Sequence, residues 1–198
     1  MDMLDEVSSL IIGDGSPVEV EITGERRLVV EEMCQNICSN PRQQGDRTDD
    51  EVYDCVCFGK AIEFGMERNG FTRTEPSGGG PIRPDRPEEW ASDLLHPGLD
   101  VRVQVKSFGD RTFFSVDPRV RREIFKNRDH YQFIATGLAK VIEPGKKYLV
   151  TPLQVIRTEG FYKYLTSSDR IGEWYYDHFK SAESGDCKFN TNSMEIRR

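Results

Sequence analysis

The sequence predicts a mixed α/β (α+β) fold in which helices flank a central mixed β-sheet. Residues 101–106 and 111–117 alternate between apolar and polar side chains, as strands with one buried face do. Residues 50–69 instead carry apolar residues at a spacing of three to four, which is typical of an amphipathic helix. A chain of 198 residues is long enough for one domain with a modest extension.

The N-terminal part of the chain is predicted to contain a strand and then a helix. VEVEI at 18–22 alternates apolar and charged residues and predicts the strand. Residues 25–39 place apolar side chains on one side of a helix. The polar segment 39–50 follows and is the best candidate for a domain boundary.

The second helix is predicted at about 50–69. Asp49 and Asp50 are the expected N-terminal caps, and Asn69-Gly70 is the expected end. Its apolar stripe consists of Val52, Cys55, Val56, Gly59, Ile62 and Met66.

The remaining elements follow a Gly- and Pro-rich loop at 76–89, which is long enough to close over a ligand. Further strands are expected at 71–75, 93–106, 111–117, 130–137 and 146–156, and further helices at 118–128 and 171–180. The predicted organisation is an N-terminal extension at 1–49, a core at 50–180 and a polar C-terminal tail at 181–198.

Residues 93–106 are the most informative stretch, because they place polar groups together on one face of a hairpin. Gln104 and Lys106 share a face of the alternating strand. Asp100 lies on the same face but about 13 Å from Gln104, at roughly 3.4 Å per residue, which is too far for one shared Mg²⁺. If Pro97-Gly98 forms a two-residue turn, Asp93 is diagonal to Gln104 across the hairpin, at roughly 7 Å. Asp93 is therefore the better candidate for a shared cation.

Glu63 falls near the middle of the apolar stripe of the second helix. A lone buried carboxylate costs several kcal/mol unless it is paired or bound to a metal. Because this helix is expected to pack on the sheet that carries Asp93 and Gln104, Glu63 is a candidate third acid of the same site. The alternative is that Glu63 lies at the edge of the stripe and reaches solvent.

An acidic residue on a helix, then an Asp, then a hairpin ending in Gln104-Val105-Lys106 resembles the core of the PD-(D/E)xK nuclease superfamily, in its QxK variant. The resemblance covers roughly residues 50–156 and implies a restriction-endonuclease-like fold. Ser92 stands where the motif has Pro, and Gln104 where it usually has an acid. A literal Pro-Asp at Pro84-Asp85 leaves Asp85 as an alternative to Asp93.

The resemblance implies a metal-dependent DNA endonuclease that hydrolyses phosphodiester bonds, of a restriction-like, homing or phage type, or junction-resolving. Asp93 and the side-chain oxygen of Gln104 are expected to bind Mg²⁺ (or Mn²⁺). Lys106 is expected to orient or deprotonate the attacking water, and Glu63 to hold a second metal or a metal-bound water. Such enzymes usually dimerise, so a homodimer is expected.

A basic cluster in the helix predicted at 118–128 is the candidate DNA-backbone contact. Arg119, Arg122 and Lys126 fall on one face of that helix, and a solvated helix face is the alternative. The overall net charge of −7 and the pI of about 5.1 count against a general nucleic-acid coat.

Composition predicts a soluble cytoplasmic protein without a membrane partner. The mean hydropathy is −0.61, no apolar run approaches about 20 residues, and the acidic start MDMLDEVSSL lacks the basic region of a secretory signal. The five cysteines are expected to be free thiols. Cys34-x3-Cys38 and Cys55-x-Cys57 do not have standard metal-ligand spacing, and Cys55 is expected in the core.

Two other function classes fit the sequence. A catalytically inactive nucleic-acid-binding module could retain the nuclease fold, with Gln104 as the sign of lost chemistry. An acidic protein-interaction protein would instead use the negative surface to contact a protein partner.

Overall fold

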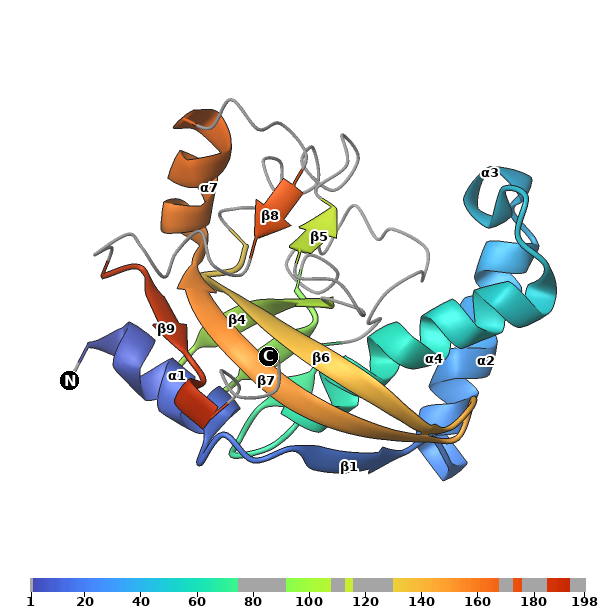
Figure 1. The fold of residues 1–198 in the computed structure, drawn as a ribbon, viewed down its shortest axis with the longest axis horizontal. Helices are drawn as coiled ribbons and strands as arrows, with labels where there is room; N and C mark the ends of the chain where they lie inside the picture. Colours follow the sequence, from blue (N-terminus) through green and yellow to red (C-terminus); the bar gives the residue numbers. More distant parts are fainter. Residues whose placement is uncertain are drawn as a thin grey trace.

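The computed structural model describes residues 2–74, 92–107, 113–115, 130–167, 173–175 and 185–192. Figure 1 shows its helices and strands with their labels. The helices are α1 (Met3–Ile12), α2 (Gly24–Cys38), α3 (Pro41–Gln44), α4 (Asp49–Met66) and α7 (Thr158–Ser167). The strands are β1 (Val18–Glu21), β2 (Thr72–Arg73), β3 (Leu94–His96), β4 (Val101–Ser107), β5 (Phe113–Ser115), β6 (Phe133–Glu143), β7 (Lys147–Arg157), β8 (Glu173–Tyr175) and β9 (Cys187–Phe189).

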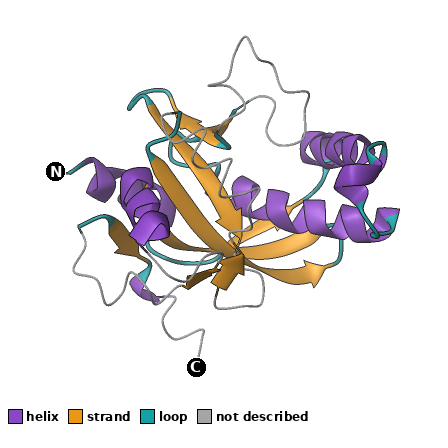
Figure 2. Cartoon of the chain, turned by 90° about the horizontal axis from the view of Figure 1, so that it is seen from above, coloured by secondary structure: helices purple, strands orange, loops and turns teal. Residues whose placement is uncertain are grey.

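A curled mixed sheet flanked by helices organises the protein, as predicted (Figures 1 and 2). The strand order is β1-β7-β6-β4-β3-β2, and β9 pairs with β7 outside this path. β4 and β6 are parallel, whereas the other neighbouring strands are antiparallel. In Figure 2, α1 lies to the left of the sheet and α2 to α4 lie to its right. β5 and β8 form a separate two-stranded sheet.

Helix α4 packs closely on the sheet because two glycines leave room for it. A Cβ atom on Gly65 of α4 would come within 2.7 Å of the Val150 side chain on β7. A Cβ atom on Gly137 of β6 would come within 2.8 Å of Ile62 and Met66. Both distances are shorter than a van der Waals contact, so the helix can sit at this depth only with glycine at both positions. This depth sets how far the α4 side chains reach towards the hairpin.

The start of α4 differs from the prediction in its cap. Thr48, and not Asp49 or Asp50, is the N-cap: its side chain accepts a hydrogen bond from the Glu51 N–H, and the Glu51 carboxylate accepts one from the Thr48 N–H. This reciprocal capping box satisfies two N–H groups that the helix leaves without partners. Asp49 and Asp50 belong to the first turn, where their charge is favourable to the helix dipole.

The predicted extension at 1–49 contributes to the same core as the rest of the sheet. β1 is the strand that its alternating sequence predicted, and it pairs with β7; α2 packs against α4. Helix α1 was not predicted; its buried Leu4, Val7 and Ile11 recur at helical spacing and join the main apolar cluster.

Three elements in the C-terminal part also differ from the prediction, and the first of them, helix α7, was not expected at all. Residues 173–175, within the helix predicted at 171–180, form strand β8, which pairs with β5; Trp and Tyr favour strands over helices. In the predicted tail, β9 adds to the edge of β7, and the buried Asn190 donates hydrogen bonds to the carbonyls of Gly15 (2.9 Å) and Pro152 (2.7 Å). The segments 76–89 and 118–128 lie outside the described residues.

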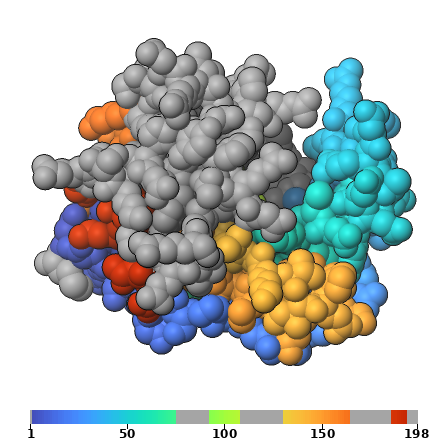
Figure 3. Space-filling view, in the orientation of Figure 1, coloured from blue at the N-terminus to red at the C-terminus, as the bar shows by residue number. Residues whose placement is uncertain are grey.

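The β6–β7 hairpin lies beside α4 on the face shown in Figure 3. Val141 and Ile142 near its tip are exposed. A cavity of about 570 Å³ opens between α4 and this hairpin, lined by Asp54, Cys55, Phe58, Ser107, Val141, Pro144 and Tyr148. Within the described ranges, no helix combines the length and the apolar character needed to cross a membrane.

Candidate active site

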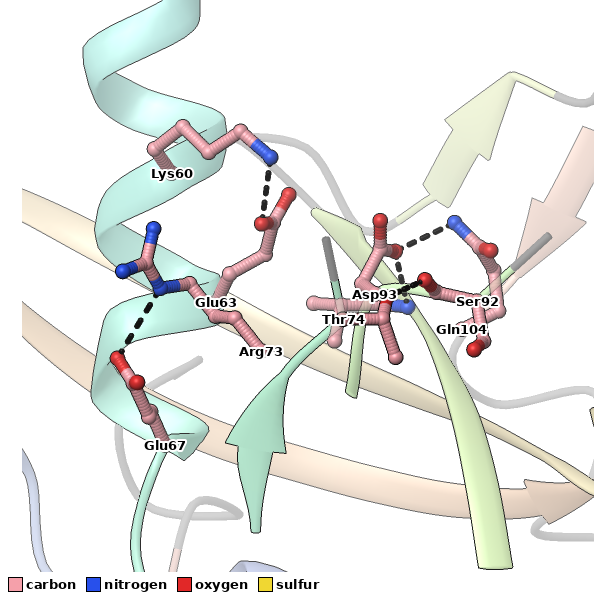
Figure 4. Close-up of polar contacts among 9 residues, drawn as sticks. Lys60, Glu63, Glu67, Arg73, Thr74, Ser92, Asp93 and Gln104 are labelled. Carbon is pink, nitrogen blue, oxygen red and sulfur yellow. Dashed lines mark hydrogen bonds and ion pairs between the residues drawn. The ribbon is translucent and has the colours of Figure 1, made fainter. Parts of the chain in front are cut away.

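The hairpin of β3 and β4 brings Asp93 directly against Gln104. Asp93 Oδ2 accepts a hydrogen bond of 2.5 Å from Gln104 Nε2 and one of 2.8 Å from the Val105 N–H. The backbone N–H of Asp93 donates to the Val103 carbonyl at 3.1 Å, which continues the ladder of the hairpin. Asp93 and Gln104 are both buried, and Figure 4 shows the contact between their side chains. The pair therefore forms a fixed polar contact inside the protein.

The register of this hairpin differs from the predicted one. The turn is four residues long, 97–100, and not the two-residue Pro97-Gly98 turn. An L-proline does not fit the primed turns of a two-residue hairpin. Leu94 consequently faces Val103, which puts Asp93 opposite Gln104 and not diagonal to it. Asp100 ends the turn at φ 51° and is exposed, at the other end of the hairpin from Asp93.

Thr74 and Arg73, at the end of β2, connect the backbone around Asp93 to β2 and α4. The Thr74 N–H donates to the Asp93 carbonyl at 3.0 Å, and the Thr74 hydroxyl donates to the Ser92 carbonyl. Arg73 forms an ion pair with Glu67 at the end of α4, with Nε–Oε2 at 3.4 Å. These contacts tie β2, β3 and α4 together at the point from which Asp93 projects (Figure 4).

Glu63 of α4 is buried beside Asp93, as the apolar stripe predicted. Burial, followed by the negative charge of Asp93, raises the pKa of the Glu63 carboxyl, which is about 7 in the folded protein. The Lys60 ammonium and the Arg73 guanidinium oppose this increase in the pKa. The Lys60 Nζ donates to Glu63 Oε2 at 2.6 Å. The alternative in which Glu63 reaches solvent is wrong.

Lys60 is the residue that sequence reasoning missed. Its side chain is only 2% exposed, although lysine is rarely buried. The signal is in the sequence: Lys60 comes four residues after Val56 and three before Glu63, so all three share one helix face. A lysine on the buried face, one turn from a buried glutamate, indicates an internal ion pair.

Lys106 follows Gln104 by two residues on β4 and so projects from the same face of the strand. It is partly buried, and its partner in the parallel pairing with β6 is Thr136. Thr136 is in turn paired with Gln154 of β7, and both are buried. A row of polar residues thus crosses three strands next to Gln104.

The oxygen atoms at this site are of the kind that Mg²⁺ binds. The carboxylates of Glu63 and Asp93 and the side-chain oxygen of Gln104 are hard ligands. The described residues contain no group of three or more His, Cys, Asp or Glu side chains arranged to hold a metal ion. A cation bound by Glu63 and Asp93 would therefore need the side-chain oxygen of Gln104 as a third protein ligand. The amide of Gln104 would also have to turn, because its nitrogen now faces Asp93.

The other predicted site residues lie outside the described part of the chain. These are Asp85 in the Gly- and Pro-rich loop and the basic residues Arg119, Arg122 and Lys126.

The cysteines described by the structure are free thiols, as predicted. The prediction that Cys55 is in the core is wrong: Cys55 is exposed and lines the 570 Å³ cavity, whereas Cys57 is buried. Burial raises the pKa of Cys34 to about 11 and also raises the pKa of Cys57.

Comparison of the chain with protein-family models, with curated proteins and with solved structures gave no match.

Proposed function

We propose that this chain is a metal-dependent DNA endonuclease with a restriction-endonuclease-like core. The observation that carries the proposal is the convergence of Glu63, Asp93 and Gln104. They come from helix α4, from the residue that precedes β3 and from β4, in the chain order that the PD-(D/E)xK motif requires. Lys106 on the same strand face as Gln104 supports the assignment.

In the proposed site, Asp93, Gln104 and Glu63 hold the cation. A bound Mg²⁺ would act as a Lewis acid on the phosphodiester and lower the pKa of a bound water. Lys106 contributes an ammonium that orients the attacking water and offsets the negative charge that develops on the phosphate. The buried surroundings strengthen these electrostatic effects because water screens them little.

The decisive test is cleavage of plasmid DNA with Mg²⁺ or Mn²⁺ by the wild type, Asp93→Asn and Lys106→Ala. Asp93→Asn keeps the shape of the side chain and removes the charge that binds the metal. Lys140→Ala is the matched control for Lys106, because Lys140 is an exposed lysine of the same sheet. We expect cleavage by the wild type and by Lys140→Ala, and loss of at least about a hundredfold in the two site variants. Equal activity in all four proteins would reject the assignment.

A catalytically inactive DNA-binding module is the second candidate, and one observation favours it. Asp93 already accepts two hydrogen bonds, and Glu63 already has the Lys60 ammonium as its partner. Such a protein would bind DNA and leave it intact at every metal concentration. Gel-shift binding together with the cleavage assay separates the two functions.

A further inference from the structure

Lys60 places a positive charge where the proposed metal site needs one. Its Nζ lies 2.6 Å from Glu63 Oε2, and the side chains of the two residues are only 2% and 12% exposed. The two residues are one turn apart on α4, so the pair forms within a single rigid element. Figure 4 shows the ammonium directed at the Glu63 carboxylate.

The acids of the site are already compensated by groups of the chain itself. Glu63 has the Lys60 ammonium, and one oxygen of Asp93 has two N–H donors. The nearby Arg73 is balanced by Glu67 at 3.4 Å and by Glu25 at 3.9 Å. A divalent cation that entered this site would bring two further positive charges close to the ammonium. Like charges at short range repel strongly where water is excluded.

The Lys60 side chain can nevertheless move its ammonium away from Glu63. It is a flexible chain of four methylene groups that carries a point charge, and it can move its ammonium several ångströms without moving the helix. Glu63, in contrast, is held in the interior and, when ionised, needs a cation as its partner with or without metal. A metal ion bound to Glu63 would replace the Lys60 ammonium as the partner of this carboxylate.

We propose that Lys60 is an internal counter-ion that occupies Glu63 in the metal-free protein and that a divalent cation has to displace. The inference rests on the proposed metal site and adds a residue that the PD-(D/E)xK motif does not contain. Lys60 is here a positioning residue: it holds Glu63 in place and sets the affinity of the site for metal. If the Lys60–Glu63 ion pair were purely structural, breaking it would lower the stability of the protein and would leave its metal affinity unchanged or weaker.

The test is Mn²⁺ binding, measured by calorimetry and by electron paramagnetic resonance, in the full chain without DNA. The proteins are the wild type, Lys60→Gln, Lys60→Met and the control Lys146→Gln. Lys146 is an exposed lysine at the β6–β7 turn, paired with Glu143, and its replacement removes the same charge far from the site. A pH of about 8.5 keeps the carboxyl groups largely ionised. Lys60→Gln keeps a hydrogen-bond donor for Glu63, so the test can still be made if Lys60→Met does not fold.

We expect both Lys60 variants to bind Mn²⁺ at least about tenfold more tightly than the wild type, because a unit positive charge has been removed. The Lys146 control should bind like the wild type, and Asp93→Asn in the Lys60→Gln background should abolish the gain. Unchanged or weaker binding in both folded Lys60 variants would overturn the counter-ion role and leave the nuclease proposal intact if wild-type binding depends on Asp93. Absence of Mn²⁺ binding in every variant would overturn both.

Discussion

Replacing Lys60 by methionine is expected to destabilise the protein by an amount that grows with pH. Methionine fills a similar volume and removes the ammonium that lies 2.6 Å from Glu63 Oε2. The Glu63 carboxylate would then be buried next to Asp93 without its cation. Breaking a buried ion pair on one side typically costs about 3–5 kcal/mol, because it leaves an uncompensated charge.

The pH dependence follows from the pKa of Glu63, which rises from an ordinary 4.5 to about 7 in the folded protein. Below the ordinary pKa, Glu63 is protonated in the folded and unfolded states and carries no penalty. As the pH rises from 4.5 to 7, the unfolded state releases its proton first, so the free energy of unfolding falls by about 3 kcal/mol in total. Lys60 lowers this pKa, so in Lys60→Met the pKa is higher and the decrease in stability continues above pH 7.

The assay is urea denaturation of the wild type and Lys60→Met at three pH values, near 5, 7 and 9. We expect the two proteins to differ little near pH 5, where Glu63 is neutral. Near pH 9, two pH units above the wild-type pKa of about 7, we expect a difference of up to about 3 kcal/mol, because protonation of Glu63 limits the cost. Lys146→Met is the control; its exposed ion pair with Glu143 should change stability by less than about 1 kcal/mol at any pH. A difference below about 1 kcal/mol near pH 9 for Lys60→Met would show that water screens the pair, and the argument from burial would fail.

Two further predictions concern the packing of α4 and the exposure of its thiols. Gly65→Ala should lower the free energy of unfolding by about 1–3 kcal/mol, because its Cβ would press on Val150. Gly59→Ala has open space around its Cβ and should raise the free energy of unfolding by about 0.5–1 kcal/mol. Thermal unfolding of both variants measures the contrast. Iodoacetamide near pH 8 should label the exposed Cys55 well before Cys34, whose pKa burial raises to about 11; mass spectrometry of a time course checks the order, and equal labelling rates would contradict the burial of Cys34.

The sequence predicted those elements whose pattern is local. β1, β4, β7, α2 and α4 were expected because alternation or helical spacing runs through each of them. Helices α1 and α7 and strand β9 were among the elements that were missed. The apolar face of α1 is short, and β9 is a three-residue strand that depends on pairing with β7. Strand β8 was mistaken for part of a helix for the same reason, since its pairing partner β5 is some 60 residues earlier in the chain.

At the candidate site, the sequence predicted that Glu63, Asp93 and Gln104 lie together, but not the register that relates Asp93 to Gln104. Glu63 was predicted to be buried from its place on the apolar stripe, and the structure confirms this. Asp93 and Gln104 were predicted as neighbours, but their register depends on a turn whose length the Pro97-Gly98 pair does not specify. Lys60 was overlooked because a lysine is normally solvated, and only its helical spacing to Glu63 points to a buried pair.

Two rearrangements oppose metal binding at this site: rotation of the Gln104 side-chain amide and displacement of the Lys60 ammonium. The amide now donates to Asp93, and a half-turn about its last bond would present the oxygen in place of the nitrogen. In the absence of a cation that turn sets a carbonyl dipole against a carboxylate, so it is favourable only when a positive charge lies between them. Metal binding in the proposed enzyme must therefore turn Gln104 and displace Lys60 together. A cation that arrived with a DNA phosphate would bring an additional ligand and a negative charge, and both would offset these two costs.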